Sequence, residues 1–178
     1  MIYYETDRLI LRNYQIDDVS DFYEYMSLEF TALHEDFEPY SLEKSEDTVK
    51  QRLNNDRYLA VVLKGNGKVI GDLTYREEDY GTYDIAYDFN EKYGKKGYAT
   101  EACKALVNHI FEVENARRLY AGVNEGNENS WRLLERLGFR REAYCIEDVS
   151  FKKDENGNPI YINSYYYALL RREWQPTV

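Results

Sequence analysis

The sequence has few of the residues that build disulfide frameworks and metal sites, with two cysteines and two histidines among 178 residues. Cys103 falls in a run with helical spacing and Cys145 in a strand-like run, so neither a disulfide framework nor a metal-ligand spacing arises. His34 and His109 stand alone, and we interpret both as structural or surface residues. The sequence therefore predicts no metal site.

Long apolar runs and an excess of basic residues are also missing. No run approaches the length of a transmembrane helix, and residues 1–5 do not read as a signal peptide, so we expect a cytoplasmic protein without a membrane partner. The net charge is −10 and the pI is near 4.8. This charge argues against nucleic-acid binding, which needs a basic surface. It favours a cationic partner such as an amine, or serves solubility alone.

The composition is that of a folded domain. A hydrophobic content of 43% and an aromatic content of 16% exclude general disorder. The length predicts one domain, over residues 1–178, that is large enough to bury a core. The nineteen tyrosines suggest amphipathic walls or partner surfaces, or a compositional bias of the source.

Hydrophobic periodicity predicts an α/β (α+β) fold with a mixed, largely antiparallel sheet. The first helix is expected to be capped at residues 17–18 and to bury Val19, Phe22, Tyr23 and Met26. The segment 154–159 lacks the glycine and glutamate of a calcium loop, so it predicts a plain hairpin turn. We expect strands at 8–14, 58–63, 68–75, 82–89, 117–123, 139–149 and 163–170, and helices at 17–26, 41–54, 99–114 and 130–137.

The stretch 93–102 joins a strand-like run to a helical run through a glycine-punctuated turn. The first N–H groups of a helix lack partners, and the helix dipole adds positive charge there. Gly94 and Gly97 let a phosphate approach the backbone closely, and Lys95 and Lys96 add full charges. The spacing fits neither the dinucleotide fingerprint nor the P-loop. We predict a pyrophosphate site, against the alternative of an ordinary strand-to-helix connection.

Several segments together resemble the GNAT superfamily of N-acetyltransferases, and within it the ribosomal-protein alanine N-acetyltransferases. They follow one another in the family's order over nearly the whole chain. The resemblance implies a single-domain GNAT-like fold with splayed middle strands flanked by helices. It also implies an enzyme that transfers an acetyl group from acetyl-CoA to a primary amine by direct attack on the thioester. The matching segments are 5–12, 70–72, 94–102 (the acetyl-CoA turn Q/R-x-x-G-x-G/A), 127–139 and 165–174.

The resemblance further implies where acetyl-CoA binds. In the family, the strand before the turn splays from its neighbour at a bulge, which leaves backbone groups near Tyr87, Asp88 and Phe89 free for the pantetheine arm. A free N–H there can stabilise the negative charge that develops on the acetyl oxygen. The pyrophosphate would lie on the N–H groups of Lys95, Lys96, Gly97, Tyr98, Ala99 and Thr100.

Two further residues are expected to contact the cofactor, each with a structural alternative. Asn127 occupies the family position that reaches the pantetheine amide, or it caps the helix that follows. Arg136 would meet the 3′-phosphate of CoA, or it is a solvated helix charge. Gly94 replaces the family's Gln or Arg and Lys95 replaces a frequent small residue. Neither change removes an anion site built mainly from N–H groups.

The reaction requires proton transfers, because the amine must be neutral when it attacks. Asp84 stands where this branch often has glutamate and is the preferred base, against the alternative of an ordinary polar strand residue. Asp72 and Glu101 are weaker candidates. The tyrosine acid of many superfamily members is absent, so Ser130 is the matching proton donor and would also contact the cofactor.

The acceptor stays open between a protein N-terminus and a small cation such as a polyamine or an aminoglycoside. A different class of function is a catalytically silent CoA-binding module that acts as a sensor or scaffold. A third interpretation is a tyrosine-rich interaction domain that binds no cofactor. A homodimer is compatible with the sequence, and no nucleic-acid partner is expected.

Overall fold

The computed structural model describes residues 2–176. They form one eight-stranded sheet in the order β1-β2-β3-β4-β5-β6-β8-β7. Over these residues all neighbouring strands pair antiparallel except β5 and β6, so the predicted mixed, largely antiparallel sheet is confirmed. The bounds 1–178 of the domain stay a prediction, since residues 1, 177 and 178 lie outside the described residues.

Two strands, three helices and three further strands follow one another before the chain alternates through one helix, one strand, another helix and the last two strands. The strands are β1 (Ile2–Glu5), β2 (Leu9–Asn13), β3 (Tyr58–Leu63), β4 (Val69–Glu78), β5 (Thr82–Phe89), β6 (Arg118–Asn124), β7 (Arg140–Lys153) and β8 (Pro159–Leu170). The helices are α1 (Val19–Met26), α2 (Glu29–Ala32), α3 (Leu42–Arg52), α4 (Tyr98–Glu112) and α5 (Glu128–Arg136), with 3₁₀ turns η1 (Ile16–Asp18), η2 (Asp79–Gly81) and η3 (Glu91–Tyr93).

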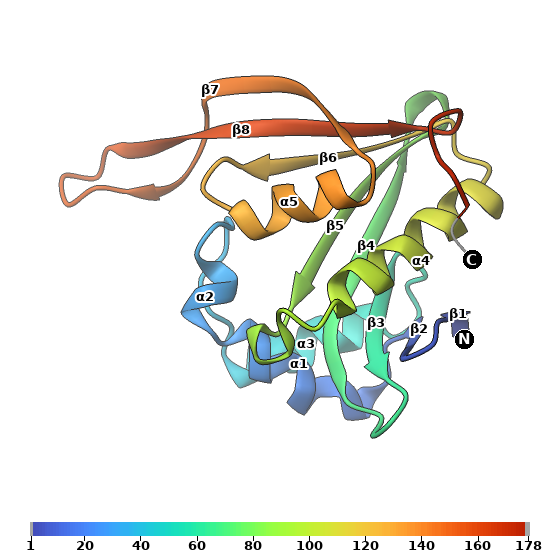
Figure 1. The fold of residues 1–178 in the computed structure, drawn as a ribbon. Helices are drawn as coiled ribbons and strands as arrows, with labels where there is room; N and C mark the ends of the chain where they lie inside the picture. The colour runs from blue at the N-terminus through green and yellow to red at the C-terminus, as the bar shows by residue number, and fades with distance from the viewer. Residues whose placement is uncertain (1, 177–178) are drawn as a thin grey trace.

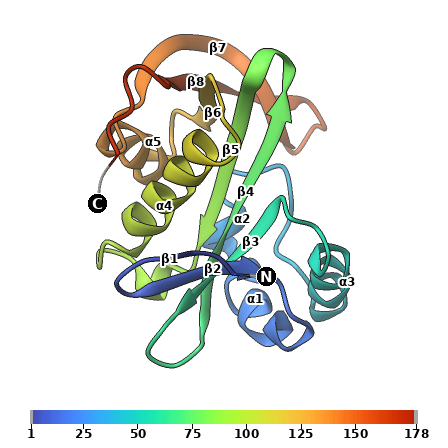
Figure 2. The ribbon, with the colours of Figure 1, turned by 90° about the vertical axis from the view of Figure 1, so that its right-hand side faces the viewer.

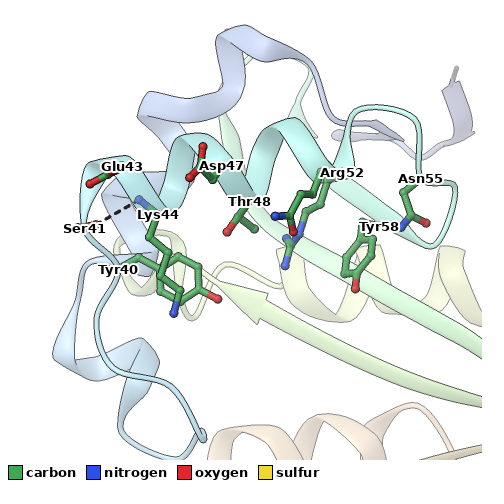
Figure 3. Close-up of a pocket in the computed structure, with 10 residues that line it drawn as sticks. Tyr40, Ser41, Glu43, Lys44, Asp47, Thr48, Arg52, Asn55 and Tyr58 are labelled. Atoms are coloured by element: carbon green, nitrogen blue, oxygen red, sulfur yellow. Dashed lines mark hydrogen bonds between the residues drawn. The ribbon is translucent and has the colours of Figure 1, made fainter.

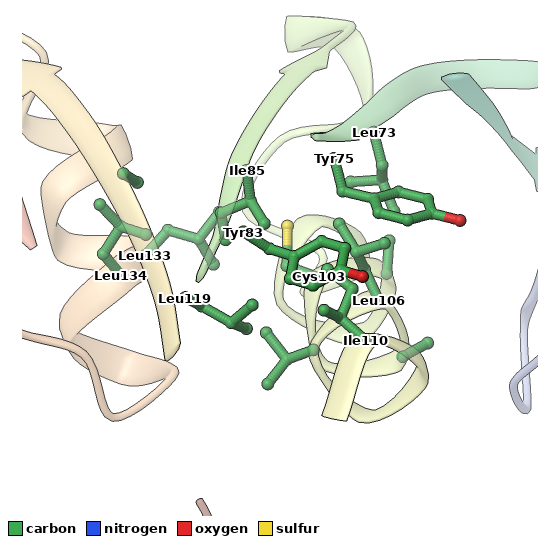
Figure 4. Packing of buried hydrophobic residues seen from close by; sticks show 14 of the residues in the cluster. Leu73, Tyr75, Tyr83, Ile85, Cys103, Leu106, Ile110, Leu119, Leu133 and Leu134 are labelled. Carbon is green, nitrogen blue, oxygen red and sulfur yellow. The ribbon is translucent and has the colours of Figure 1, made fainter. Parts of the chain in front are cut away.

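Helices cover both faces of the sheet. Figure 2 shows α4 and α5 on one side and α3 on the other. The larger apolar core lies under α4 and α5, where the buried faces of both helices meet β4, β5 and β6 (Figure 4). A smaller core, which includes Phe22, Tyr25 and Val49, joins α1 and α3 to β3. Within the described residues, no helix has the length and apolar character to cross a membrane.

The middle of the sheet opens between β5 and β6. These parallel strands pair only from Thr82 to Asp84 and then diverge, as Figure 1 shows. The divergence begins where β6 follows its antiparallel partner β8 while β5 stays paired with β4. The predicted bulge near residues 87–89 is wrong, because the β4–β5 register is continuous from Gly71 opposite Phe89 to Glu78 opposite Thr82. The splay itself, implied by the family resemblance, is present.

Several local predictions need correction. Asp18 is the N-cap residue of α1 as expected, but its side chain makes no capping hydrogen bond, because its carboxylate accepts hydrogen bonds from both terminal nitrogens of Arg12, at 2.7 and 2.8 Å. Tyr25, rather than Tyr23, is buried on α1. The strands β4, β7 and β8 run further than expected, and β1 and α2 were not predicted. Gly138, with φ at +88°, does close α5 as expected.

Candidate active site

The predicted anion site lies in the turn between β5 and α4. Gly97 is the N-cap of α4 with φ at +82°, and Lys95 also has a positive φ of 59°. Within the described residues, the N–H groups of residues 95–97 have no hydrogen-bond partner. The first N–H groups of α4 are free by helix geometry. Together they form a concave set of donors at a positive helix end, which suits an anion.

The β1–β2 connection holds this turn in place. Arg8 donates through Nη1 to the carbonyl of Lys96 at 3.0 Å and through Nε to Glu101 at 2.7 Å, and its guanidinium stacks over the ring of Tyr98. Thr6 also donates to Glu101. Burial opposes ionisation of Glu101, but the hydrogen bonds from Thr6 and Arg8 lower its pKa. Glu101, one of the weaker candidate bases, therefore anchors the turn and does not line the cavity described next.

A cavity of about 250 Å³ occupies the opening between β5 and β6. Its walls come from both faces of the sheet, because successive residues of β5 point in opposite directions. Tyr87 packs against the core under α4 and α5, whereas Ala86 is exposed on the other face. The lining residues are His34, Glu35, 85–87, 121–124, Asn127, Ser130, Asp148, Val149, Phe151, Ser164 and Tyr166.

On the α5 side of the cavity, two hydroxyl groups meet. The oxygen of Tyr87 lies 3.0 Å from Oγ of Ser130, and the Tyr87 hydroxyl also donates to the Ser130 carbonyl at 3.1 Å. Burial raises the pKa of Tyr87, so the phenol stays protonated at neutral pH. Asn127 accepts a hydrogen bond from the N–H of Ser130 at 3.2 Å, so its expected capping role is present while its side chain also lines the cavity.

The opposite side of the cavity carries carboxylates. Glu35 reaches it from the loop after α2 and Asp148 from β7. The hydroxyl of Tyr166 donates to Asp148 at 3.1 Å. Burial and the neighbouring charge of Asp36 raise the pKa of Glu35 to about 7. Neither carboxylate was predicted, because the loop sequence around Glu35 gives no motif and only the fold brings it to β5.

The two strand aspartates lie outside the lining of this cavity. Asp84 is at the closed end of the opening, opposite Arg76 and Tyr120, and its carboxylate is 3.6 Å from the Arg76 guanidinium. Burial raises the pKa of Asp84, and the charge of Arg76 opposes this shift. Asp72 is 2% exposed, accepts a hydrogen bond from Tyr25 at 2.7 Å, and is 3.3 Å from Arg52. Asp72 therefore has a structural role.

A larger cavity, of about 620 Å³, lies beside α3 (Figure 3). It shares no residue with the cavity between β5 and β6. Its two cations are already engaged, since Lys44 stacks over the Tyr40 ring and Arg52 stacks over Tyr58 and pairs with Asp72. It offers no diverging strand edges, and the Ser41 side chain caps the helix start that borders it. We therefore place the chemistry in the smaller cavity.

The family model described as "Acetyltransferase (GNAT) domain" matches residues 8–140, three quarters of the chain. This chain belongs to the GNAT acetyltransferases. A curated relative, "Uncharacterized N-acetyltransferase YnaD" of Bacillus subtilis (strain 168), is 30% identical over 171 residues, covering 95% of this chain and 97% of the relative. The predicted superfamily is thus confirmed, and the chain is an N-acetyltransferase.

Solved structures confirm the predicted GNAT fold. An acetyltransferase (GNAT family) from Bacillus anthracis superposes with a TM-score of 0.87 at 28% identity, covering 97% of this chain and all of that one. The spermidine N-acetyltransferase from Vibrio cholerae, solved with CoA and spermine, has a TM-score of 0.77 at 18% identity, covering 94% and 98%. Ribosomal-protein acetyltransferases also share the fold.

GNAT members bind CoA, and the residues present here fit it. The free donors of the turn and the positive φ of Gly97 suit a diphosphate, and the unpaired edges of β5 and β6 suit an extended amide chain. Among residues 2–176, no cluster of three or more His, Cys, Asp or Glu side chains is placed to hold a metal ion.

Proposed function

We propose that this GNAT enzyme transfers the acetyl group of acetyl-CoA directly to the primary amine of a small cationic acceptor. The observation that carries the proposal is the cavity between β5 and β6. One side holds the hydroxyl groups of Tyr87 and Ser130, and the other side holds carboxylates. Two substrates can therefore reach one point from opposite faces of the sheet.

The cofactor is proposed to bind along the α4 and α5 side. The diphosphate would be held by the N–H groups of residues 95–100, with added charge from Lys95 and Lys96. The free edge of β5 at Tyr87 and Phe89 would pair with the pantetheine arm as a neighbouring strand does. Asn127 and Ser130 would contact it from α5. Burial raises the pKa of Tyr87, and the charge of Arg136 opposes this rise, so Arg136 is within electrostatic reach of this side.

Residues of the chain would then take part in two proton transfers, one from the amine and one to the departing sulfur. The amine nitrogen forms a bond to the acetyl carbon, the carbon–sulfur bond breaks, and the amine loses a proton to a base. The departing sulfur takes a proton from Ser130 or from water. The contact with Tyr87 orients the Ser130 hydroxyl, which compensates for the missing tyrosine of α5. Asp84 remains a candidate base because burial raises its pKa.

The size and charge of the cavity support a small cationic acceptor. A volume of about 250 Å³ is below the usual range of ligand pockets, which begins at about 300 Å³. Glu35 and Asp148 line it, and no lysine or arginine does. A polyamine fits this environment better than a folded protein N-terminus. The proposal is supported by the V. cholerae spermidine N-acetyltransferase, which shares the fold and was solved with CoA and spermine.

The test is acetyl-CoA with a panel of diamines, polyamines, aminoglycosides and N-terminal peptides, with thiol release and product mass as readouts. We expect release with small di- and polycations and little with peptides. Release with peptides alone would contradict the proposed acceptor. Tight CoA binding by calorimetry without release from any amine would replace the proposal with a silent CoA-binding module. Absence of CoA binding would contradict both.

A further inference from the structure

The loop after α2 brings one carboxylate to the cavity between β5 and β6. Glu35 lies three residues beyond the end of α2 and, with His34, lines the same cavity as Ser130. Figure 1 shows this loop at the wide end of the opening, below α5. The side chain is half-buried, and within residues 2–176 no hydrogen bond or ion pair engages its carboxylate. A carboxylate so placed is available to the acceptor.

The charges around Glu35 are mostly negative. Asp36 adjoins it on the same loop, and Asp88 of β5 is near enough for the two charges to interact. Asp148 of β7 lines the same cavity. The charge of Lys152 of β7 acts on the neighbouring His34, whose pKa is lowered first by burial and then by that charge. Burial without a cationic partner favours the protonated acid and brings its pKa to about 7.

The other carboxylates are less suited to take a proton from the amine. Asp84 lies outside the cavity lining and faces Arg76. Asp148 is exposed and already accepts a hydrogen bond from Tyr166. Asp72 and Glu101 are held by arginines. A general base works best when it is in reach of the substrate and its pKa is near the working pH.

We propose that Glu35 is the general base, accepting the proton of the attacking amine directly or through one water molecule. This assignment rests on the proposed transfer reaction. The nitrogen–carbon bond forms as the carbon–sulfur bond breaks, the amine proton moves to the Glu35 carboxylate, and the sulfur leaves with its electron pair. Solvent then removes the proton from Glu35.

The experiment compares Glu35→Gln with the matched control Glu38→Gln, an exposed glutamate on the same loop. We expect kcat/KM of Glu35→Gln to fall about 100-fold, a typical loss for a general base, with the acetyl-CoA dissociation constant unchanged. In wild type, kcat/KM should rise with pH through an apparent pKa near 7, and Glu35→Gln should lose this step. Glu38→Gln should behave as wild type.

A second measurement separates proton transfer from a purely structural role. An acceptor amine that is already neutral at pH 7 forms an acidic ammonium group as it attacks, and this group can lose its proton to water, so such an amine should restore Glu35→Gln to near wild-type rates. If Glu35→Gln keeps the acidic limb of the profile, or is not restored by the weakly basic amine, the inference is wrong. If Asp84→Asn, and not Glu35→Gln, lost the rise of kcat/KM with pH, Asp84 would be the general base. Wild-type protein that acetylates no amine would contradict the proposed function itself.

Discussion

The two sides of the opening between β5 and β6 differ in chemistry. The α4 and α5 side presents backbone N–H groups, the hydroxyls of Tyr87 and Ser130, and two lysines. The opposite side presents Glu35 and Asp148, with Asp72 and Asp88 further along the same face. In the proposed reaction, an anionic cofactor and a cationic acceptor would thus be drawn to opposite faces. One opening in a sheet can thus offer separate binding surfaces to two substrates and still bring their reacting groups together.

The strand β5 produces much of this contrast. Its residues alternate between the two faces, so Tyr87 points toward α5 while Asp88 lies on the side of Asp72. Burial raises the pKa of Asp88, and the nearby charges of Asp72 and Glu35 raise it further. One short stretch therefore contributes to the hydroxyl side and to the acidic side.

The largest expected effect comes from removing the buried ion pair between Asp72 and Arg52 on the acidic side of the opening. Asp72→Asn would leave Arg52 without its ionic partner in an enclosed site, so we expect a loss of about 3–5 kcal/mol in unfolding free energy. Urea denaturation measures it, with the exposed Asp79→Asn as control. A loss below about 1 kcal/mol, the scale of a surface pair, would show that the pair is not structural.

The next effect tests the donor side. Gly97→Ala would force a side chain into a left-handed conformation, with its Cβ 3.4 Å from Arg8, and would shift the N–H groups of the turn. We expect CoA affinity, measured by calorimetry, to fall about 10- to 100-fold, equivalent to roughly 1.4–2.7 kcal/mol.

Gly67→Ala is the control for this substitution. Gly67 has a similar φ of +74° in the β3–β4 turn, with open space around it. Both variants should lose stability, because the left-handed conformation penalises any side chain. A comparable affinity loss in Gly67→Ala would remove the special role of the α4 turn.

A smaller effect is expected from removing the hydrogen bond between the hydroxyl groups of Tyr87 and Ser130 on the α5 side of the opening. Tyr87→Phe removes the hydrogen bond to Ser130, worth about 1 kcal/mol, so we expect kcat to fall about fivefold with an unchanged KM for acetyl-CoA. Ser130→Ala should cost a similar amount, and the double variant should lose less than the sum. Strict additivity of the two losses would mean that the hydroxyls act independently.

The smallest effect contrasts two glutamates of opposite pKa shift. Hydrogen bonds from Lys68 and then Lys92 lower the pKa of Glu24 to about 2. Its stabilisation, about 1 kcal/mol or less for a surface pair, is therefore present above pH 4.5 and is lost as the pH falls toward 2. Glu35, with its raised pKa, favours folding below pH 4.5, and this contribution is lost as the pH rises through about 7.

Thermal unfolding of Glu24→Gln and Glu35→Gln between pH 2 and 8 measures how the stability of each variant depends on pH. Glu24→Gln should remove the dependence of stability on pH between about 2 and 4.5, and Glu35→Gln should remove the dependence between about 4.5 and 7. Neither variant should change the dependence in the other range. A common window for the two variants would contradict the contrast between a paired and an unpaired carboxylate.

Local patterns in the sequence predicted what depends on local geometry. The glycine turn, the cap at Asn127 and the splayed strands were accessible in this way, or through the resemblance. The contact between Tyr87 and Ser130 joins residues 43 positions apart, and the approach of Glu35 to β5 depends on how a loop packs. No periodicity encodes such contacts. For the same reason the sequence favoured Asp84, whose strand position was predictable, over a loop glutamate whose location was not.

Within residues 2–176, main-chain hydrogen bonds link the two halves of the sheet only along the short ladder from Thr82 to Asp84 and, just before it, from the N–H of Arg117 to the carbonyl of Gly81. Beyond this ladder, apolar packing and the hydrogen bond between Tyr87 and Ser130 hold the halves at their angle. A molecule that places an extended amide chain in the gap would form hydrogen bonds with the unpaired backbone groups of β5 and β6, as an additional strand does. Amide hydrogen exchange along the facing edges should therefore slow when the donor substrate is present, and the melting temperature should rise with its concentration.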